Sequence, residues 1–136
     1  MDNTVIKYLK KVLDFDKSEV KEIRLEAIKN DDFEVNNYRF ISDDIIDDVM
    51  IEELSSDTYM LGCFNADFLS SICDLPYDVI VALQEAESFE AIGEVAIANI
   101  KQIAEEYARL DGYGHHFSSY DGHGHEVENW HIFRVN

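Results

Sequence analysis

The chain has 136 residues, of which 29 are acidic and 11 are basic, and its formal net charge is −18 at pH 7. Because 46% of the residues are hydrophobic, the composition is that of a folded globular protein and excludes wholesale disorder. A field this negative repels nucleic-acid phosphates and anionic membranes, so we expect no direct binding to nucleic acid or to a membrane.

The N-terminal segment, residues 1–30, is predicted to form a pair of amphipathic helices over residues 3–14 and 18–28. It holds seven of the basic residues and six acidic ones, which makes it nearly neutral. A near-neutral helical pair is suited to packing on a second copy, so a homodimer formed through residues 1–30 is one expectation. No linker rich in proline, glycine or serine follows, so residues 1–136 are predicted to form a single domain.

The remaining residues, 31–136, are predicted to form an α+β body. In chain order we expect a strand, a helix, a second strand and two helices, at residues 33–41, 43–54, 58–63, 66–73 and 77–87. The spacing of the last two helices resembles a helix–turn–helix, but the second helix offers no basic side chain to DNA. We therefore interpret this helical pair as packing scaffold.

The longest predicted element is a helix over residues 88–110. Apolar residues recur there at steps of three and four, which places them along one face. A helix with so apolar a face is a core element, so we expect the domain to pack around it. Strands at residues 115–120 and 125–135 are predicted to follow as a C-terminal β-hairpin that turns at Asp121-Gly122. All four predicted strands are expected to form one small antiparallel sheet.

Acidic residues are concentrated in the middle of the chain. Between residues 40 and 100 there are fourteen of them and no lysine or arginine. On the outer side of the helix predicted at residues 43–54, like charges stand four residues apart, which costs roughly 0.2–0.5 kcal/mol per pair. We call this predicted partner-binding surface the acidic ridge; its members are Asp43, Asp44, Asp47, Asp48, Glu52 and Glu53. The alternative interpretation is a solvated face with no partner.

All five histidines fall within the last 22 residues. With a turn at Asp121-Gly122, the sheet brings His116, His123 and His125 onto one face. Imidazoles beside a carboxylate are ligands for Zn or Ni, so a metal-binding or metal-dependent protein is an alternative hypothesis; otherwise no cofactor is expected. No nucleophile elbow or phosphate-binding glycine loop occurs, so no catalytic residue is predicted and a binding role is favoured over an enzyme.

The C-terminal run GYGHHFSSYDG at residues 112–122, followed by Glu126 and the closing FRVN, carries a resemblance. It resembles the ending of small, acidic, uncharacterised proteins encoded by tailed phages, prophages and plasmids. The resemblance implies a mobile-element protein that works in the cytoplasm of a bacterial host cell. The absence of a hydrophobic signal core at the N-terminus agrees with a cytoplasmic location.

Mobile elements also carry acidic proteins that inhibit restriction or CRISPR nucleases, and this chain resembles those inhibitors in charge and size. The acidic ridge, the resemblance and the charge together predict an anti-defence protein. It would bind and inhibit a basic, nucleic-acid-handling protein of the host through protein–protein contacts.

Overall fold

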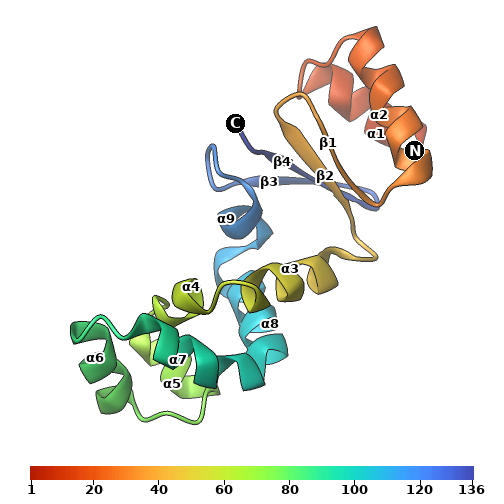
Figure 1. The fold of residues 1–136 in the computed structure, drawn as a ribbon. Coiled ribbons are helices and arrows are strands. Elements are labelled where there is room, and N and C mark those ends of the chain that lie inside the picture. Colours follow the sequence, from red (N-terminus) through yellow and green to blue (C-terminus); the bar gives the residue numbers. More distant parts are fainter. The chain divides into compact units, whose positions relative to one another are not determined.

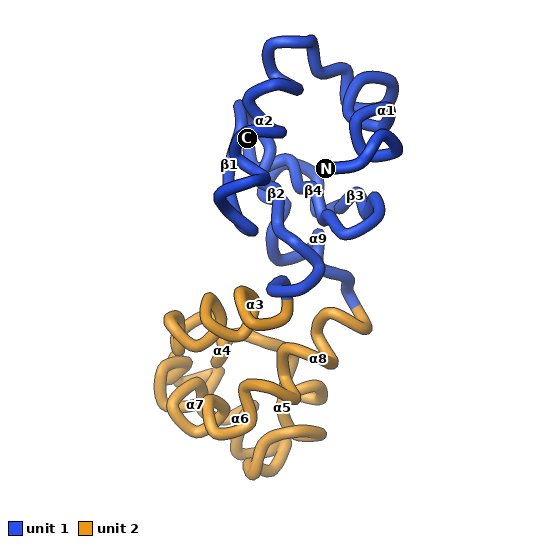
Figure 2. The backbone as a smooth tube through the Cα atoms, turned by 90° about the vertical axis from the view of Figure 1, so that its right-hand side faces the viewer, with its two compact units in different colours: residues 1–46, 111–136 blue, residues 47–110 orange.

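The computed structural model describes all residues from 1 to 136, and its fold is α+β, as predicted (Figure 1). The backbone divides into two compact units (Figure 2). Unit 1 comprises Met1–Ile46 and Asp111–Asn136, and unit 2 comprises Asp47–Leu110. The helical pair predicted at residues 1–30 belongs to unit 1 together with the sheet, so the chain does not divide at residue 30. The prediction that both units form one domain stays a prediction.

Unit 1 contains a four-stranded antiparallel sheet and three helices. Its elements are α1 (Asn3–Lys11), α2 (Lys17–Lys29), β1 (Asp32–Val35), β2 (Tyr38–Ser42), α9 (Tyr113–Phe117), β3 (Gly124–Val127) and β4 (Trp130–Arg134). The strand order is β1-β2-β4-β3, so the two central strands come from opposite sides of unit 2 in the sequence. Asp2 and Asp16 cap the N-termini of α1 and α2, and their carboxylates accept hydrogen bonds from backbone N–H groups of the first turn.

The sheet consists of two β-hairpins. The single strands predicted at residues 33–41 and 125–135 are therefore wrong, because each segment folds back on itself. Residues 33–41 turn back at Asn36-Asn37, so they form β1 and β2 instead of one strand. Residues 125–135 turn back at Glu128-Asn129, so the C-terminal hairpin joins β3 to β4. The first residue of each turn has a positive φ, 55° at Asn36 and 54° at Glu128. Both turns have the two-residue length that most hairpins use.

One face of the sheet is buried against α1 and α2, which lie together beside it in Figure 1. Phe40 is at the centre of this core; it is fully buried and stacks on Phe33 at 5.0 Å between ring centroids. The helices contribute aliphatic side chains such as Leu9 and Ile23, both fully buried. Since successive residues of a strand point to opposite faces, the alternate residues of β2, β3 and β4 face the other way.

The opposite face of the sheet is covered by α9, in the segment where a strand was predicted over residues 115–120. The rings of Phe117 on α9 and Phe133 on β4 lie 5.2 Å apart, and the Arg39 guanidinium lies 5.2 Å from the Phe117 ring centre. The strand prediction is wrong because Gly112, with a φ of 80°, starts a new helical turn directly after the preceding helix. Asp121-Gly122 consequently belongs to the loop between α9 and β3 and makes no hairpin.

Unit 2 is entirely helical. Its elements are α3 (Ile46–Ser55), α4 (Thr58–Gly62), α5 (Ala66–Ile72), α6 (Tyr77–Glu85), α7 (Phe89–Ala96), the 3₁₀ turn η1 (Ile97–Asn99) and α8 (Ile100–Asp111). Helix α3 begins at Ile46, the last residue of the first segment of unit 1, and α8 ends at Asp111, the first residue of the second segment of unit 1. The predicted strand at residues 58–63 is wrong, because Asp57 caps α4 there by accepting from the Met60 N–H at 3.0 Å.

The helix predicted over residues 88–110 is helical throughout but is not continuous. The turn η1 separates α7 from α8, and its three residues per turn shift the phase of the apolar stripe. Ile92 and Ile103 are therefore buried on the two halves, whereas Val95 and Ile97 near the break are partly exposed. None of the helices in the structure combines the length and the apolar character that crossing a membrane requires.

Two glycines allow α4 and α7 to cross at backbone distance. A Cβ atom added at Gly62 would lie 1.8 Å from the Phe89 carbonyl oxygen, and one added at Gly93 would lie 1.7 Å from the Thr58 carbonyl oxygen. Each glycine is thus opposite the first residue of the other helix. Beside this crossing, the rings of Tyr59 and Phe89 are in edge contact at 5.3 Å.

Candidate functional site

The predicted acidic ridge is divided between the two units. Asp43 and Asp44 lie in unit 1, in the turn that follows β2, whereas Asp47, Asp48, Glu52 and Glu53 lie in unit 2 on α3. Five of the six side chains are exposed, and Glu53 is half-buried. Neither unit assembles the whole ridge by itself, and the part on α3 belongs to a unit that is acidic throughout.

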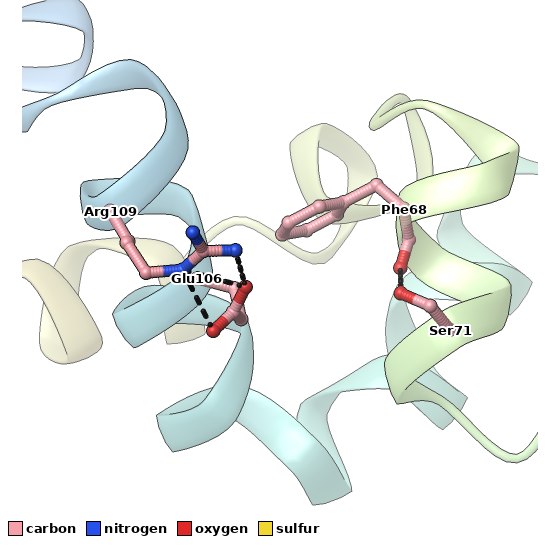
Figure 3. Close-up of polar contacts among 4 residues, drawn as sticks. All are labelled: Phe68, Ser71, Glu106 and Arg109. Atoms are coloured by element: carbon pink, nitrogen blue, oxygen red, sulfur yellow. Dashed lines mark hydrogen bonds and ion pairs between the residues drawn. The ribbon is translucent and has the colours of Figure 1, made fainter.

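Unit 2 contains fourteen acidic residues and two basic ones, which gives a formal charge of −12. Unit 1 contains the other fifteen acidic and nine basic residues, a formal charge of −6. Of the two cations in unit 2, Arg109 already forms an ion pair at 2.7 Å with Glu106 on the same helix (Figure 3). The hydrogen bond from Arg109 lowers the pKa of Glu106. Lys101 is the one other basic side chain of this unit.

Ser70 and Ser71 of unit 2 use their hydroxyls within α5. Figure 3 shows the Ser71 hydroxyl donating to the Phe68 carbonyl oxygen at 2.7 Å, and Ser70 donates to the Asp67 carbonyl in the same way. Such bonds satisfy the hydroxyl within its own helix. What unit 2 offers to a partner is a surface rich in carboxylates.

The three histidines predicted to bind metal are not brought together on one sheet face. His116 lies on α9, in edge contact with the neighbouring Phe117 ring. His125 lies on β3 opposite Ile132, and therefore on the face that α1 covers, where its Nδ1 is hydrogen-bonded to the Tyr8 hydroxyl at 2.6 Å. His123 is in the bend before β3. The predicted arrangement on one sheet face required a strand at residues 115–120, and a helix forms there instead. Metal binding by these histidines stays a prediction.

A different histidine stands beside two carboxylates in unit 1. Asp43, Glu126 and His131 each present one potential ligand atom, and these atoms all lie within 4.8 Å of one another. The sheet explains the arrangement: Glu126 is directly opposite His131 across the β3–β4 ladder, and Ile41 is opposite His131 across the β2–β4 ladder. Asp43, two residues beyond Ile41, is therefore a diagonal neighbour of the histidine.

Backbone and side-chain contacts hold this cluster in place. The Asp43 N–H donates to the Asn129 carbonyl oxygen at 2.7 Å, which ties the turn after β2 to the β3–β4 turn. His131 Nε2 and Asp43 Oδ1 lie 2.7 Å apart, within hydrogen-bond distance. The His131 side chain is 6% exposed, and the Tyr113 ring is in edge contact with it at 5.2 Å.

A hollow of about 320 Å³ adjoins the cluster. Its lining includes Glu126 and His131 together with Tyr113 and Gly114 of α9 and His123 and Gly124 before β3. The loop at its edge is fixed by Asp121, whose carboxylate accepts from the His123 N–H at 3.0 Å and from the Ser118 hydroxyl at 2.9 Å. The backbone hydrogen bond from His123 is the main cause of the lowered pKa of Asp121.

Sequence reasoning named Asp43 for a different role and did not single out Glu126 or His131 as site residues. Their one local signal is the hairpin turn at Glu128-Asn129, which places these two residues opposite each other. The chain is thus an α+β protein of two compact units. In unit 2 nearly all charged residues are acidic, and unit 1 carries a His–carboxylate cluster. Comparison with known proteins finds no matching family model, no matching curated protein and no matching solved structure.

Proposed function

We propose that this protein binds a cationic partner protein through the acidic helical unit. The observation that carries the proposal is the charge of unit 2, which is −12 over 64 residues with only two basic side chains. Solvated surfaces ordinarily mix charges of both signs, because a single-sign field weakens the fold by self-repulsion. Repulsion among the carboxylates of unit 2 would decrease when a cationic surface binds next to them, so this surface is suited to a cationic partner.

Helix α3 is the part of unit 2 where this repulsion is most direct. Asp48 and Glu52 are exposed at a spacing of four residues, and the last turn of the helix has no basic residue. Like charges at this spacing destabilise a helix by roughly 0.2–0.5 kcal/mol per pair. A cationic surface docked on α3 would turn this cost into attraction, and long-range steering would speed the encounter at low salt.

The partner class follows from charge and from the C-terminal resemblance. Proteins that handle nucleic acids carry the basic surfaces that a body of this charge would occupy. The resemblance of residues 112–122 to proteins of phages, prophages and plasmids suggests a mobile-element protein in a bacterial host. We therefore propose an anti-defence protein that blocks a basic, nucleic-acid-handling host protein, with restriction and CRISPR nucleases as the leading candidates.

Charge reversal with a matched control tests this function. In a pulldown from bacterial lysate, wild-type protein should capture basic nucleic-acid-handling proteins, and added salt should weaken the capture. The variant Asp47→Lys, Asp48→Lys and Glu52→Lys, in which all three changes lie on α3 of unit 2, should lose it. A control that makes the same change of net charge in unit 1, Glu22→Lys, Glu34→Lys and Glu128→Lys, should retain it.

Thermal unfolding by circular dichroism separates lost binding from lost structure. The reversals exchange one exposed like-charge pair on α3 for another and place lysine in its first turn, so the first variant should fold with slightly lower stability than wild type. Equal capture by both variants, or equal loss in both, would show that α3 carries no specific docking surface. The negative charge of unit 2 would then serve only to keep the protein in solution.

A second candidate function is a homodimeric accessory, which exposed apolar side chains on the N-terminal helices favour. Leu25 and Ile28 on α2 are 52% and 81% exposed, and both line a groove of about 460 Å³ along the helical pair. In light scattering, a dimer that becomes monomeric on Leu25→Glu with Ile28→Glu supports this function. The control is Val79→Glu, an exposed position in unit 2. A wild-type monomer removes the candidate.

A further inference from the structure

We infer that Asp43, Glu126 and His131 form a binding site for one divalent transition-metal ion, with Zn²⁺ as the best fit and one coordination position open to the adjoining hollow. The site is distinct from the histidine set that the sequence suggested. It also lies in unit 1, so it is independent of the partner surface proposed for α3.

The donor set decides the class of metal. One imidazole nitrogen and two carboxylate oxygens are ligands that Zn²⁺ accepts, whereas Mg²⁺ and Ca²⁺ take oxygen ligands alone. The two carboxylates also neutralise the two charges of the ion. With three protein ligands the site is of the open kind, in which water or a small ligand completes the coordination.

The distances suit one ion after small side-chain movements. Ligands of a tetrahedral Zn²⁺ at about 2.0–2.1 Å are separated from one another by about 3.3 Å. His131 Nε2 and Asp43 Oδ1 are 2.7 Å apart, and no two of the three ligand atoms are more than 4.8 Å apart, so small movements bring the set to this spacing. The buried imidazole is the fixed member, and the exposed side chains of Asp43 and Glu126 are free to adjust around it.

The surroundings of His131 point independently to a ligand. The ring is held by Tyr113 at its edge and lies parallel to the Phe133 ring at 6.3 Å, so its orientation is fixed before any ion arrives. The hollow lined by Glu126 and His131 gives the remaining coordination position access from outside. A purely structural histidine–aspartate pair has no need of the second carboxylate or of an adjoining hollow.

Zn²⁺ titration of untagged, full-length protein by isothermal calorimetry tests the site. Because 29 carboxylates attract divalent cations broadly, the titration is run with a millimolar excess of Mg²⁺ to occupy weak sites. We expect one tight Zn²⁺ per chain. Glu126→Gln and Asp43→Asn should each weaken it at least as much as the loss of an outer-shell partner does, roughly 10–100-fold.

Two controls make the result specific. Glu128→Gln removes the same charge two residues from Glu126, and His123→Ala removes a histidine of the sequence-predicted set; both should bind Zn²⁺ like wild type. Equal affinity of the Glu126→Gln and Glu128→Gln variants would overturn the assignment, as would the absence of tight binding by wild-type protein. Loss of binding in the His123 variant would overturn it too. Both ligand substitutions replace exposed side chains by near-isosteric ones, so the fold is preserved in the test.

Discussion

The two compact units differ in how they are built and in what they carry. Unit 1 is held together by strand pairing between segments far apart in the chain, and it contains all five histidines and nine of the eleven basic residues. Unit 2 is one contiguous helical segment whose helices meet through apolar side chains and glycines, and its outside is acidic. The net charge of −18 is therefore not a uniform property of the molecule.

This comparison separates two kinds of chemistry. The fixed polar geometry of unit 1 comes from ladder registers, which place particular side chains opposite one another. The helices of unit 2 display carboxylates without fixing them against one another, which is suited to long-range attraction. Two spectroscopic signals distinguish the units: the single tryptophan, Trp130, is buried in unit 1, whereas most of the helical signal comes from unit 2, with a smaller part from α1, α2 and α9.

The largest effect is expected from Phe40→Ala, which would break unit 1. Phe40 is fully buried at the centre of β2 and stacks on Phe33. Its truncation should lower the free energy of unfolding by about 3–5 kcal/mol, because the cavity adds to the lost burial. Urea unfolding followed by Trp130 fluorescence measures the change. A helical signal that persists after the fluorescence transition would show that unit 2 is stable by itself.

Gly93→Ala should destabilise unit 2 and leave unit 1 folded, the opposite of the effect expected for Phe40→Ala. The added methyl group would meet the Thr58 carbonyl oxygen at 1.7 Å, so α4 and α7 must separate. We expect a loss of about 3 kcal/mol, the upper end of the usual cost of overpacking. Circular dichroism at a helical wavelength should show the loss while Trp130 fluorescence holds. Ala91→Ser, on the exposed side of the same helix, is the control, and simultaneous loss of both signals would contradict independent units.

Tyr8→Phe should have a smaller effect that is confined to unit 1. The substitution removes the hydrogen bond between the Tyr8 hydroxyl and His125 Nδ1, which joins α1 to β3. A hydrogen bond of this kind contributes about 1 kcal/mol net. Hydrogen exchange should accelerate in α1 and stay unchanged in unit 2. Tyr120→Phe, at an exposed ring that lies over Arg134, should leave exchange as it is in wild type.

The smallest effect is the acid sensitivity conferred by Asp121. Its pKa in the folded protein is below the usual value near 3.8, so the ionised carboxylate stabilises the fold above that pH. The contribution is lost as the pH falls through the lowered pKa, where the folded state must take up a proton. Asp121→Asn should therefore be slightly less stable than wild type at pH 7, and the difference should vanish in acid. Thermal melts between neutral pH and pH 3 measure it.

Helices with local signals were predictable from the sequence. The helices predicted at residues 43–54, 66–73 and 77–87 are confirmed, within a few residues at each end, as α3, α5 and α6. Their apolar spacing lies within the helix itself, and Asn65 caps α5 as its residue type suggests. Helix α4 had the signal of Asp57 as a cap, but its five residues are too few for periodicity to outweigh the β-branched and aromatic residues at its start.

The sheet and the His131 cluster could not be predicted because they depend on long-range register. The Asn36-Asn37 turn is recognisable from residue type, whereas Glu128 adopts a positive φ without any such preference. Pairing of β4 with β2 decides that His131 is beside Asp43, and nothing near either residue in the sequence encodes that pairing. The charge of the middle segment was visible at once, but its division between two units was not.

The insertion of unit 2 between β2 and α9 has a consequence for how the protein is made. The ribosome completes every residue of unit 2 before it reaches β4, so the helical unit is free to fold while β2 still has an unpaired edge. Until residues 130–134 emerge, the nascent chain presents the apolar side chains of β1 and β2 without their central partner strand. The nascent chain is therefore most exposed to aggregation in the period before β4 has been synthesised and has paired with β2.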